Sequence, residues 1–332
     1  MSAPELGLNP VMNAVYAHAS RYGGIMPVEA LKSSLRRQVE DRLDRAAQAY
    51  LGDRTLARID FAQPPGEAAL VGPDSISWRI FKNPVSLFIG GVAAVILELA
   101  EPRVRTGVWE NTSFRDNPVG RLKRTGLAAM VTVYGARSQA EAMIARINAI
   151  HNQIAGVTPD GAPFHASDPE LLTWVQATAA FGFVEAYSAY AAPLSDAERD
   201  RYYAESRTAA GLYGAVNAPT SIAEQDSLFV SMFPKLESSE TIFEFLKIMK
   251  KAGAFPQPAQ LAQRSVVRAA VELTPAPVRQ RLGLGAKFGL RPFEGRVVRR
   301  MARRADRLIL RSGPAAQACK RLGLPEDFLY AR

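Results

Sequence analysis

Apolar residues recur at every third or fourth position along most of the chain, which is the spacing of one face of an α-helix. Strand-like alternation is scarce, and the sequence contains no internal repeat. The longest apolar run, at residues 85–100, contains Glu98 and is shorter than the roughly 20 residues that a membrane span requires. This run therefore predicts a buried core helix, and the pattern as a whole predicts an all-α fold with a single large helical domain.

Helix ends are marked by capping residues. Three serines are each followed three residues later by glutamate, which is the spacing of the capping box. The pairs are Ser138 with Glu141, Ser195 with Glu198 and Ser221 with Glu224. Asp168 before Pro169 predicts a further helix start, and Gly253 predicts a left-handed helix end.

Proline and glycine clusters divide the chain into three parts. We predict an N-terminal helical extension at residues 1–71, with one or two amphipathic helices. A helical core follows at residues 72–253. Residues 254–332 are expected to form a proline-containing connection and basic C-terminal helices that pack on the core.

The net charge of +9 is concentrated near the C-terminus, because residues 261–332 hold 16 Lys or Arg and five Asp or Glu. A basic helix predicted from Arg296 to Arg311 carries Val297, Val298 and Met301 on its apolar side. This helix could lie on an anionic membrane as a peripheral contact. The other interpretation is a helix packed on the core with a solvated basic face. No recognition-helix motif accompanies the charge, so no nucleic acid partner is expected.

The single cysteine, Cys319, excludes an intrachain disulfide and favours a reducing compartment. The first residues lack the basic start and apolar run of a secretory signal. We therefore expect a cytoplasmic protein.

Several kinds of active site are disfavoured by the sequence. The only histidines are His18, His151 and His165, which excludes a histidine-rich metal cage. No CxxC, Walker phosphate loop, dinucleotide-binding fingerprint or GxSxG elbow is present. Nucleotide-dependent and serine-hydrolase chemistry are therefore not expected.

His151 shares one apolar helix face with Ile144, Ile147 and Ile154, at spacings of three and four, so its imidazole should point inward. One interpretation is a core histidine that is hydrogen-bonded to a carbonyl. The other is a neutral imidazole that ligates one metal whose remaining ligands come from a porphyrin.

Arg121, Arg124 and Thr125 share a second helix face, just before an apolar run. Guanidinium groups near apolar surface are costly unless they meet an anion. A haem propionate, or oxygen on a haem iron, would meet that need. Alternatively, this is a solvated helix end that is paired with Glu110 or Asp116.

Five segments in order carry a family resemblance. They are GGVAAVILELAEPRVRTGVWENTSFRDNPVGRLKRT, VYG, His151 with NQIAG, PFHASDPELLTWVQAT and PLSDAERDRYYAE. The chain from about residue 71 to residue 214, with the C-terminal RLGLPEDFLY, resembles the MpaB-type oxygenase family, which is related to the latex-clearing protein or rubber oxygenase.

The resemblance implies an all-α fold around a buried pocket for non-covalently held haem b. It also implies that dioxygen is used to cleave carbon–carbon double bonds of isoprenoid chains. His151 matches the family's proximal iron ligand. Arg121 and Thr125 match an arginine and a threonine beside the haem, Arg124 occupies the position of a lysine, and Glu110 matches the active-site carboxylate.

The sequence also departs from the family pattern. Arg124 remains protonated and cannot act as an occasional iron ligand, as a lysine amine can. Glu101 and Gln176 stand where many relatives have histidine, which leaves His151 as the remaining ligand candidate. His165 is expected to be exposed.

These observations favour a haem b-dependent oxygenase that uses O₂ on a hydrophobic alkene such as an isoprenoid. The alternative is a non-catalytic helical protein that binds a lipid or a membrane surface and keeps the fold without haem. A third hypothesis is a carboxylate-bridged iron pair, which the scarcity of histidines disfavours.

Overall fold

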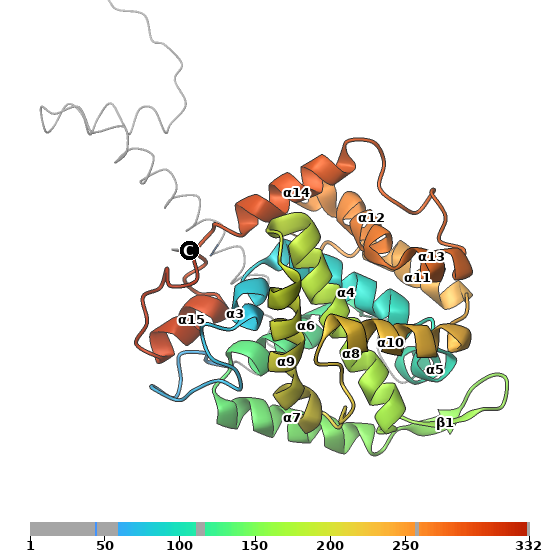
Figure 1. The fold of residues 1–332 in the computed structure, drawn as a ribbon, viewed down its shortest axis with the longest axis horizontal. Coiled ribbons are helices and arrows are strands. Elements are labelled where there is room, and N and C mark those ends of the chain that lie inside the picture. Colours follow the sequence, from blue (N-terminus) through green and yellow to red (C-terminus); the bar gives the residue numbers. More distant parts are fainter. Residues whose placement is uncertain (1–43, 45–58, 111–116, 256–258, 331–332) are drawn as a thin grey trace, which may run out of the picture.

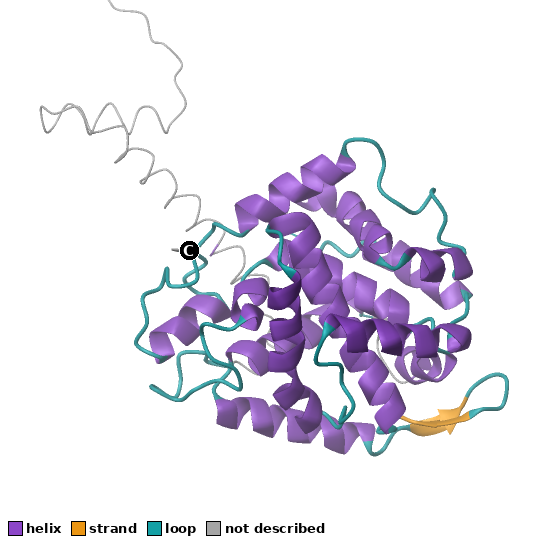
Figure 2. Cartoon of the chain, in the orientation of Figure 1, coloured by secondary structure: helices purple, strands orange, loops and turns teal. Residues whose placement is uncertain are grey.

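A computed structural model describes Asp44 and residues 59–110, 117–255 and 259–330. These residues form a mainly helical body with one small hairpin, as Figures 1 and 2 show, so the all-α prediction is confirmed. The N-terminal amphipathic helices predicted from the sequence lie outside the described residues.

The elements are α3 (Ile76–Phe81), α4 (Pro84–Glu98), α5 (Pro102–Glu110), α6 (Pro118–Tyr134), α7 (Arg137–His151), β1 (Ala155–Val157), β2 (Pro163–His165), α8 (Pro169–Ala186), the π-helix η1 (Tyr187–Ala191), α9 (Asp196–Leu212), α10 (Ile222–Met232), the 3₁₀-helices η2 (Phe233–Lys235) and η3 (Ala259–Ala262), α11 (Glu240–Met249), α12 (Gln263–Leu273), α13 (Ala276–Arg281), α14 (Glu294–Ala305) and α15 (Pro314–Arg321).

The centre of the fold is the crossing of α4 and α8, whose backbones touch at Gly90 and Gly182. A Cβ atom on Gly90 would lie 2.5 Å from the carbonyl oxygen of Gly182, and one on Gly182 would lie 2.3 Å from that of Gly90. Farther along the crossing, the buried Trp174 donates from Nε1 to the carbonyl of Leu97, at 3.3 Å. Only glycine permits the close backbone approach at Gly90 and Gly182, so these two glycines set the spacing of the core.

Most helix starts follow the sequence signals. Asp168 caps α8 by accepting from the backbone N–H of Glu170, and Ser195 forms the predicted capping box with Glu198. Asn83 caps α4 from a fully buried position, accepting from two backbone N–H groups of the first turn.

The capping box predicted at Ser138 is wrong. Helix α7 begins at Arg137, and its N-cap residue makes no side-chain cap. The backbone N–H and hydroxyl of Ser138 donate to Glu67 instead, at 2.6 and 3.0 Å. A tertiary contact with the segment that precedes α3 therefore replaces the local cap. Glu141 pairs with Arg137 at 3.5 Å.

The C-terminal helices join the same hydrophobic core, which runs from Phe61 to Leu329. Tyr187 of η1 donates to Asp306 after α14, at 3.2 Å. Lys82 pairs with the same aspartate at 3.3 Å, and Asn83 donates to the carbonyl of Ala302 at 3.0 Å. Helix α14 is thereby fixed to the start of α4.

The predicted basic helix is shorter than expected, because α14 ends at Ala305. Val298 and Ala302 are its buried residues, whereas Val297 is 52% exposed. Successive residues on a helix are rotated by about 100°, so Val297 lies beside the buried stripe and not within it. Val297, which was predicted on the apolar side of this helix, is therefore exposed.

A short antiparallel hairpin was not predicted from the sequence. β1 and β2 pair with Ala155 opposite His165 and Val157 opposite Pro163. Three-residue strands are too short for their alternation to be recognised.

No single helix within the described ranges is long and apolar enough to cross a membrane. Helices α4 and α5 taken together have the length and apolar composition of a membrane span, but a bend of 113° separates them.

We expect Gly90→Ala to lower the free energy of unfolding by about 2–3 kcal/mol, because the added methyl group meets backbone atoms that cannot move independently. The matched control is Gly91→Ala in the same helix, where the nearest atom to a new Cβ is 4.0 Å away. The control should change stability by at most about 1 kcal/mol, in the stabilising direction. Urea unfolding of both variants measures this, and equal midpoints would contradict the importance of the crossing.

Candidate functional site

His151 is the last residue of α7 and is partly buried. Its Nδ1 is buried and has no hydrogen-bond partner among the described residues. Burial lowers the pKa of His151, and the nearby charge of Arg121 lowers it further. The imidazole is therefore held neutral near pH 7, which is the form that can ligate a metal.

Arg121 lies in the first turns of α6, partly buried. Asn117 caps this helix by accepting from the backbone N–H of Gly120, at 2.8 Å. Burial lowers the pKa of Arg121, whereas the negative charge of Glu98 raises it and Arg124 lowers it. The Nε atom of Arg121 is buried without a partner in the described part of the chain. An anion placed here would meet an unsatisfied donor.

Glu98 ends α4 and faces Arg121. Burial raises the pKa of Glu98 to about 7, although the charge of Arg121 and the polar side chain of Thr178 in α8 act in the opposite direction. Loss of hydration thus outweighs both favourable interactions. Glu98 therefore exchanges a proton near neutral pH.

Four helices consequently bring three ionisable groups together. Glu98 comes from α4, Arg121 from α6 and His151 from α7, while α8 supplies Thr178. Sequence reasoning found Arg121 and His151 but used Glu98 only as an argument against a membrane span. The available signal was an acidic residue in the last turn of an otherwise apolar core helix.

The other predicted site residues lie differently. Thr125 and Arg124 are exposed, although the charge of Arg124 still acts on Arg121. Glu110 is exposed at the end of α5. Residues 111–116, which include Asp116, lie outside the described ranges. The structure thus brings Arg121 next to Glu98 and His151. The role of Glu110 as the active-site carboxylate stays a prediction.

Glu101 and His165 are two other positions that bear on the choice of His151 as the predicted iron ligand. Glu101 is buried and accepts from the backbone N–H of Val104 and from Nε of Arg103, both at 2.7 Å, so it caps α5. His165 is exposed on β2, as expected, and its Nδ1 lies 2.6 Å from the hydroxyl of Ser167.

The chemistry of this site fits a haem. No group of three or more His, Cys, Asp or Glu side chains that could hold a metal ion occurs in the portion of the chain that the structure describes. A single histidine is the protein contribution that iron in a porphyrin requires, and His151 can supply it. The unpartnered Nε of Arg121 would suit a propionate.

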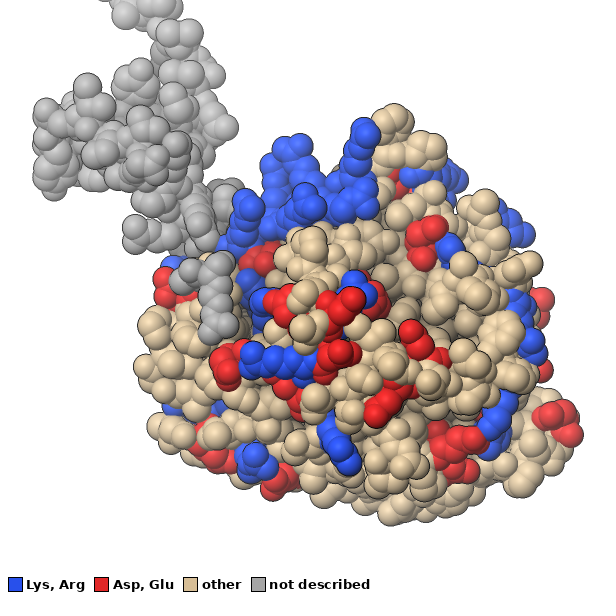
Figure 3. All heavy atoms as spheres, viewed as in Figure 1, with Lys and Arg blue, Asp and Glu red and all other residues tan. Residues whose placement is uncertain are grey.

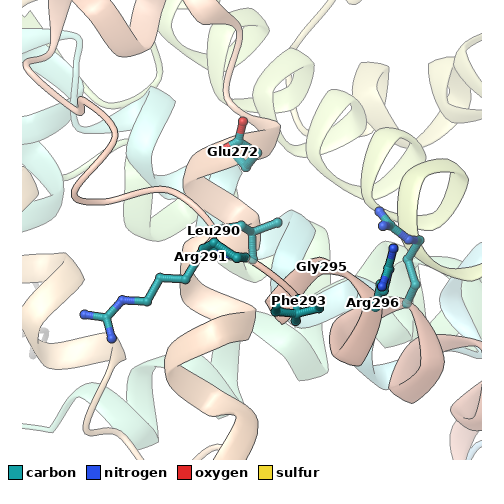
Figure 4. Close-up of a pocket in the computed structure, with 8 residues that line it drawn as sticks. Glu272, Leu290, Arg291, Phe293, Gly295 and Arg296 are labelled. Atoms are coloured by element: carbon teal, nitrogen blue, oxygen red, sulfur yellow. The ribbon is translucent and has the colours of Figure 1, made fainter.

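A hollow at the start of α14, shown in Figure 4, belongs to another part of the molecule. Its lining includes Glu272, Phe293 and Arg296. Glu98, Arg121 and His151 are not among its lining residues, and in Figure 1 α14 lies at the top while α7, which ends at His151, lies at the bottom.

The raised pKa of Glu98 makes folding stability depend on pH. Between pH 4.5 and about 7 the folded state holds a proton that the unfolded chain has lost. The contribution of Glu98 to stability therefore falls as pH rises through this window. We expect Glu98→Gln to remove this dependence, so that the variant gains on the order of 1–3 kcal/mol relative to the wild type between pH 5 and pH 8.

Urea unfolding of both proteins at several pH values measures this difference. His151 has a lowered pKa, so its contribution is lost as pH falls below the ordinary histidine value. That contribution is common to both proteins and cancels in the difference. Parallel stability curves for the wild type and the variant would show that Glu98 titrates normally.

Comparison with known proteins identifies the family. The family model for the "ER-bound oxygenase mpaB/B'/Rubber oxygenase, catalytic domain" matches residues 78–307, a span that includes Glu98, Arg121 and His151. No curated protein and no solved structure matches the chain. The family resemblance is thereby confirmed, and since the match covers more than half of the chain, this protein belongs to the mpaB/rubber oxygenase family of oxygenases.

Proposed function

We propose that the protein is a haem b-dependent oxygenase that uses O₂ on a hydrophobic, isoprenoid-like alkene, with His151 as the protein ligand of the iron. The observation that carries this proposal is the partly buried, neutral imidazole of His151, which has an unpartnered nitrogen beside Arg121. A core histidine that only stabilised the fold would be expected to have its buried nitrogen hydrogen-bonded.

Bound haem would supply the redox chemistry that activates dioxygen. The side chains around it have separate tasks. His151 would hold the cofactor as its protein ligand, and no second protein ligand would be required. Arg121 holds a permanent positive charge in a partly dehydrated position, where it can neutralise a propionate or negative charge that develops during the reaction.

Glu98 is the group suited to move a proton. A carboxyl group with a pKa of about 7 can accept or release a proton at neutral pH with little cost. Its position beside Arg121 couples the two, because loss of the proton creates an ion pair. We therefore assign Glu98, rather than the exposed Glu110, to proton transfer at this site.

The surroundings of His151 suit an apolar ligand. Ile150, the preceding residue, is 56% exposed, and Val157 on β1 is 60% exposed. Leu212 is also exposed, and its carbonyl accepts from the side chain of Asn148 on α7, at 2.8 Å. Exposed apolar side chains next to His151 in the sequence and on a segment that is hydrogen-bonded to α7 favour a hydrophobic partner over a charged one.

The decisive experiment is the absorption spectrum of the protein purified after expression with ample haem. We expect a Soret band in the wild type that shifts on reduction with dithionite and again with carbon monoxide. His151→Ala should lose this band, because the iron would have no protein ligand. The matched control is His165→Ala, which should retain it. A colourless wild type would favour the non-catalytic lipid-binding alternative, and a full Soret band in His151→Ala would refute the assignment of the ligand.

A second variant tests the role of Arg121. We expect Arg121→Gln to lower O₂ uptake with an apolar polyene such as squalene by about 10²-fold, as for the loss of one charge-stabilising donor. The control is Arg146→Gln, which removes an exposed arginine from α7. Uptake is measured per bound haem, so a loss of cofactor is separated from a loss of turnover. Unchanged uptake per haem in Arg121→Gln would contradict this role.

A further inference from the structure

Helix α14 presents a strongly basic surface to solvent. Five of its arginines are exposed and form no ion pair with a described residue; this set, called the arginine face, comprises Arg296, Arg299, Arg300, Arg303 and Arg304. The nearby acidic groups are already used. Glu294 pairs with Arg268 at 2.7 Å, and Asp306 pairs with Lys82. Figure 3 shows Lys and Arg side chains gathered over this edge of the molecule.

Phe293 directly precedes α14 and has an unusual backbone conformation. Its φ angle is 69°, and it is the only non-glycine residue with a positive φ in the described part of the chain. A bulky residue in this left-handed region is strained by about 1–2 kcal/mol. The carbonyl of Phe293 accepts from the backbone N–H groups of Arg296 and Val297, at 3.0 and 3.2 Å, which starts the helix.

The strain is not compensated by burial of the ring, because Phe293 is 73% exposed. The guanidinium of Arg296 lies 5.6 Å from the ring centroid, and Val297, beside it, is 52% exposed. In Figure 4 the ring of Phe293 lies beside Arg296, while Arg291 extends away from it. An exposed aromatic ring thus lies next to Arg296 at one end of the arginine face.

The opposite side of α14 fixes its orientation. Val298 and Ala302 are fully buried against the body of the protein. The arginine face must therefore point outward along the whole helix, with Phe293 and Val297 near its start. This arrangement matches a helix that lies parallel to an interface, with cations at the level of the lipid headgroups and an apolar side chain that enters the acyl region.

We propose that the arginine face and Phe293 together dock the protein on an anionic lipid membrane. Charge complementarity carries the choice of partner, since five arginines lack a described counter-ion and each contributes on the order of 1 kcal/mol near an anionic bilayer surface. Phe293 distinguishes this partner from a nucleic acid, because a bilayer offers an apolar phase to the ring. The proposal is independent of the haem site.

The test uses co-sedimentation of the full-length protein with vesicles, at about 0.1 M salt. We expect binding to phosphatidylcholine vesicles that contain about 30% phosphatidylglycerol, little binding to pure phosphatidylcholine, and loss of binding at about 0.5 M salt. The double variant Arg300→Gln/Arg304→Gln should bind about 25-fold more weakly, at roughly fivefold per arginine. The control with the same change of charge is Arg146→Gln/Arg207→Gln, on exposed positions of α7 and α9, which should bind as the wild type does.

Phe293→Gly separates docking from folding. Glycine adopts a positive φ without strain, so this variant should unfold at the same or a higher temperature than the wild type. We expect it to bind the anionic vesicles about five- to tenfold more weakly, because the inserted ring is lost.

Three results would overturn the proposal. They are unchanged vesicle binding in Phe293→Gly, equal binding to neutral and anionic vesicles, and tighter binding to a double-stranded oligonucleotide than to the anionic vesicles at the same salt concentration.

Discussion

The contact between Gly90 and Gly182 determines how the rest of the molecule is arranged. Because two backbones meet there without side chains between them, α4 and α8 hold a fixed spacing. Eight residues after Gly90, α4 ends at Glu98, and four residues before Gly182, α8 carries Thr178 beside that carboxylate. The packing of these two helices thus sets the environment of Glu98, which is the one acidic residue of α4. The pair α6 and α7 then supplies Arg121 and His151 against this framework.

Burial shifts the pKa values of these three groups in the directions that favour their neutral forms. It raises the pKa of Glu98 and lowers the pKa values of Arg121 and His151, so each is pushed toward its neutral form. Structural ion pairs usually show the reverse pattern, in which each partner stabilises the charge of the other. A cluster whose members are poorly hydrated and incompletely paired is destabilising unless a ligand satisfies it. This is the physical basis for assigning function to these residues.

The sequence predicted most of the helical organisation because its signals were local. Asp168 before Pro169 and Ser195 with Glu198 depend only on groups a few residues apart, and both behave as predicted. The capping box predicted at Ser138 was wrong because the backbone N–H of Ser138 donates to Glu67, which is distant in the sequence. For the site, helical spacing alone predicted that His151 faces inward, and its Nδ1 is buried. The environment of Glu98 could not be predicted, since it depends on residues from α6 and α8 that only the tertiary fold brings together.

One consequence concerns the distance between the two surfaces of interest. Asn83, at the start of α4, is bonded to the carbonyl of Ala302 in α14, and Glu98 ends the same helix. At 1.5 Å per residue, the 15 residues of α4 separate these points by about 22 Å. The basic edge and the ionisable cluster are therefore held at opposite ends of one rigid rod. A hydrophobic molecule that left a membrane at the basic edge would still have to cover a distance comparable to one bilayer leaflet to reach the cluster.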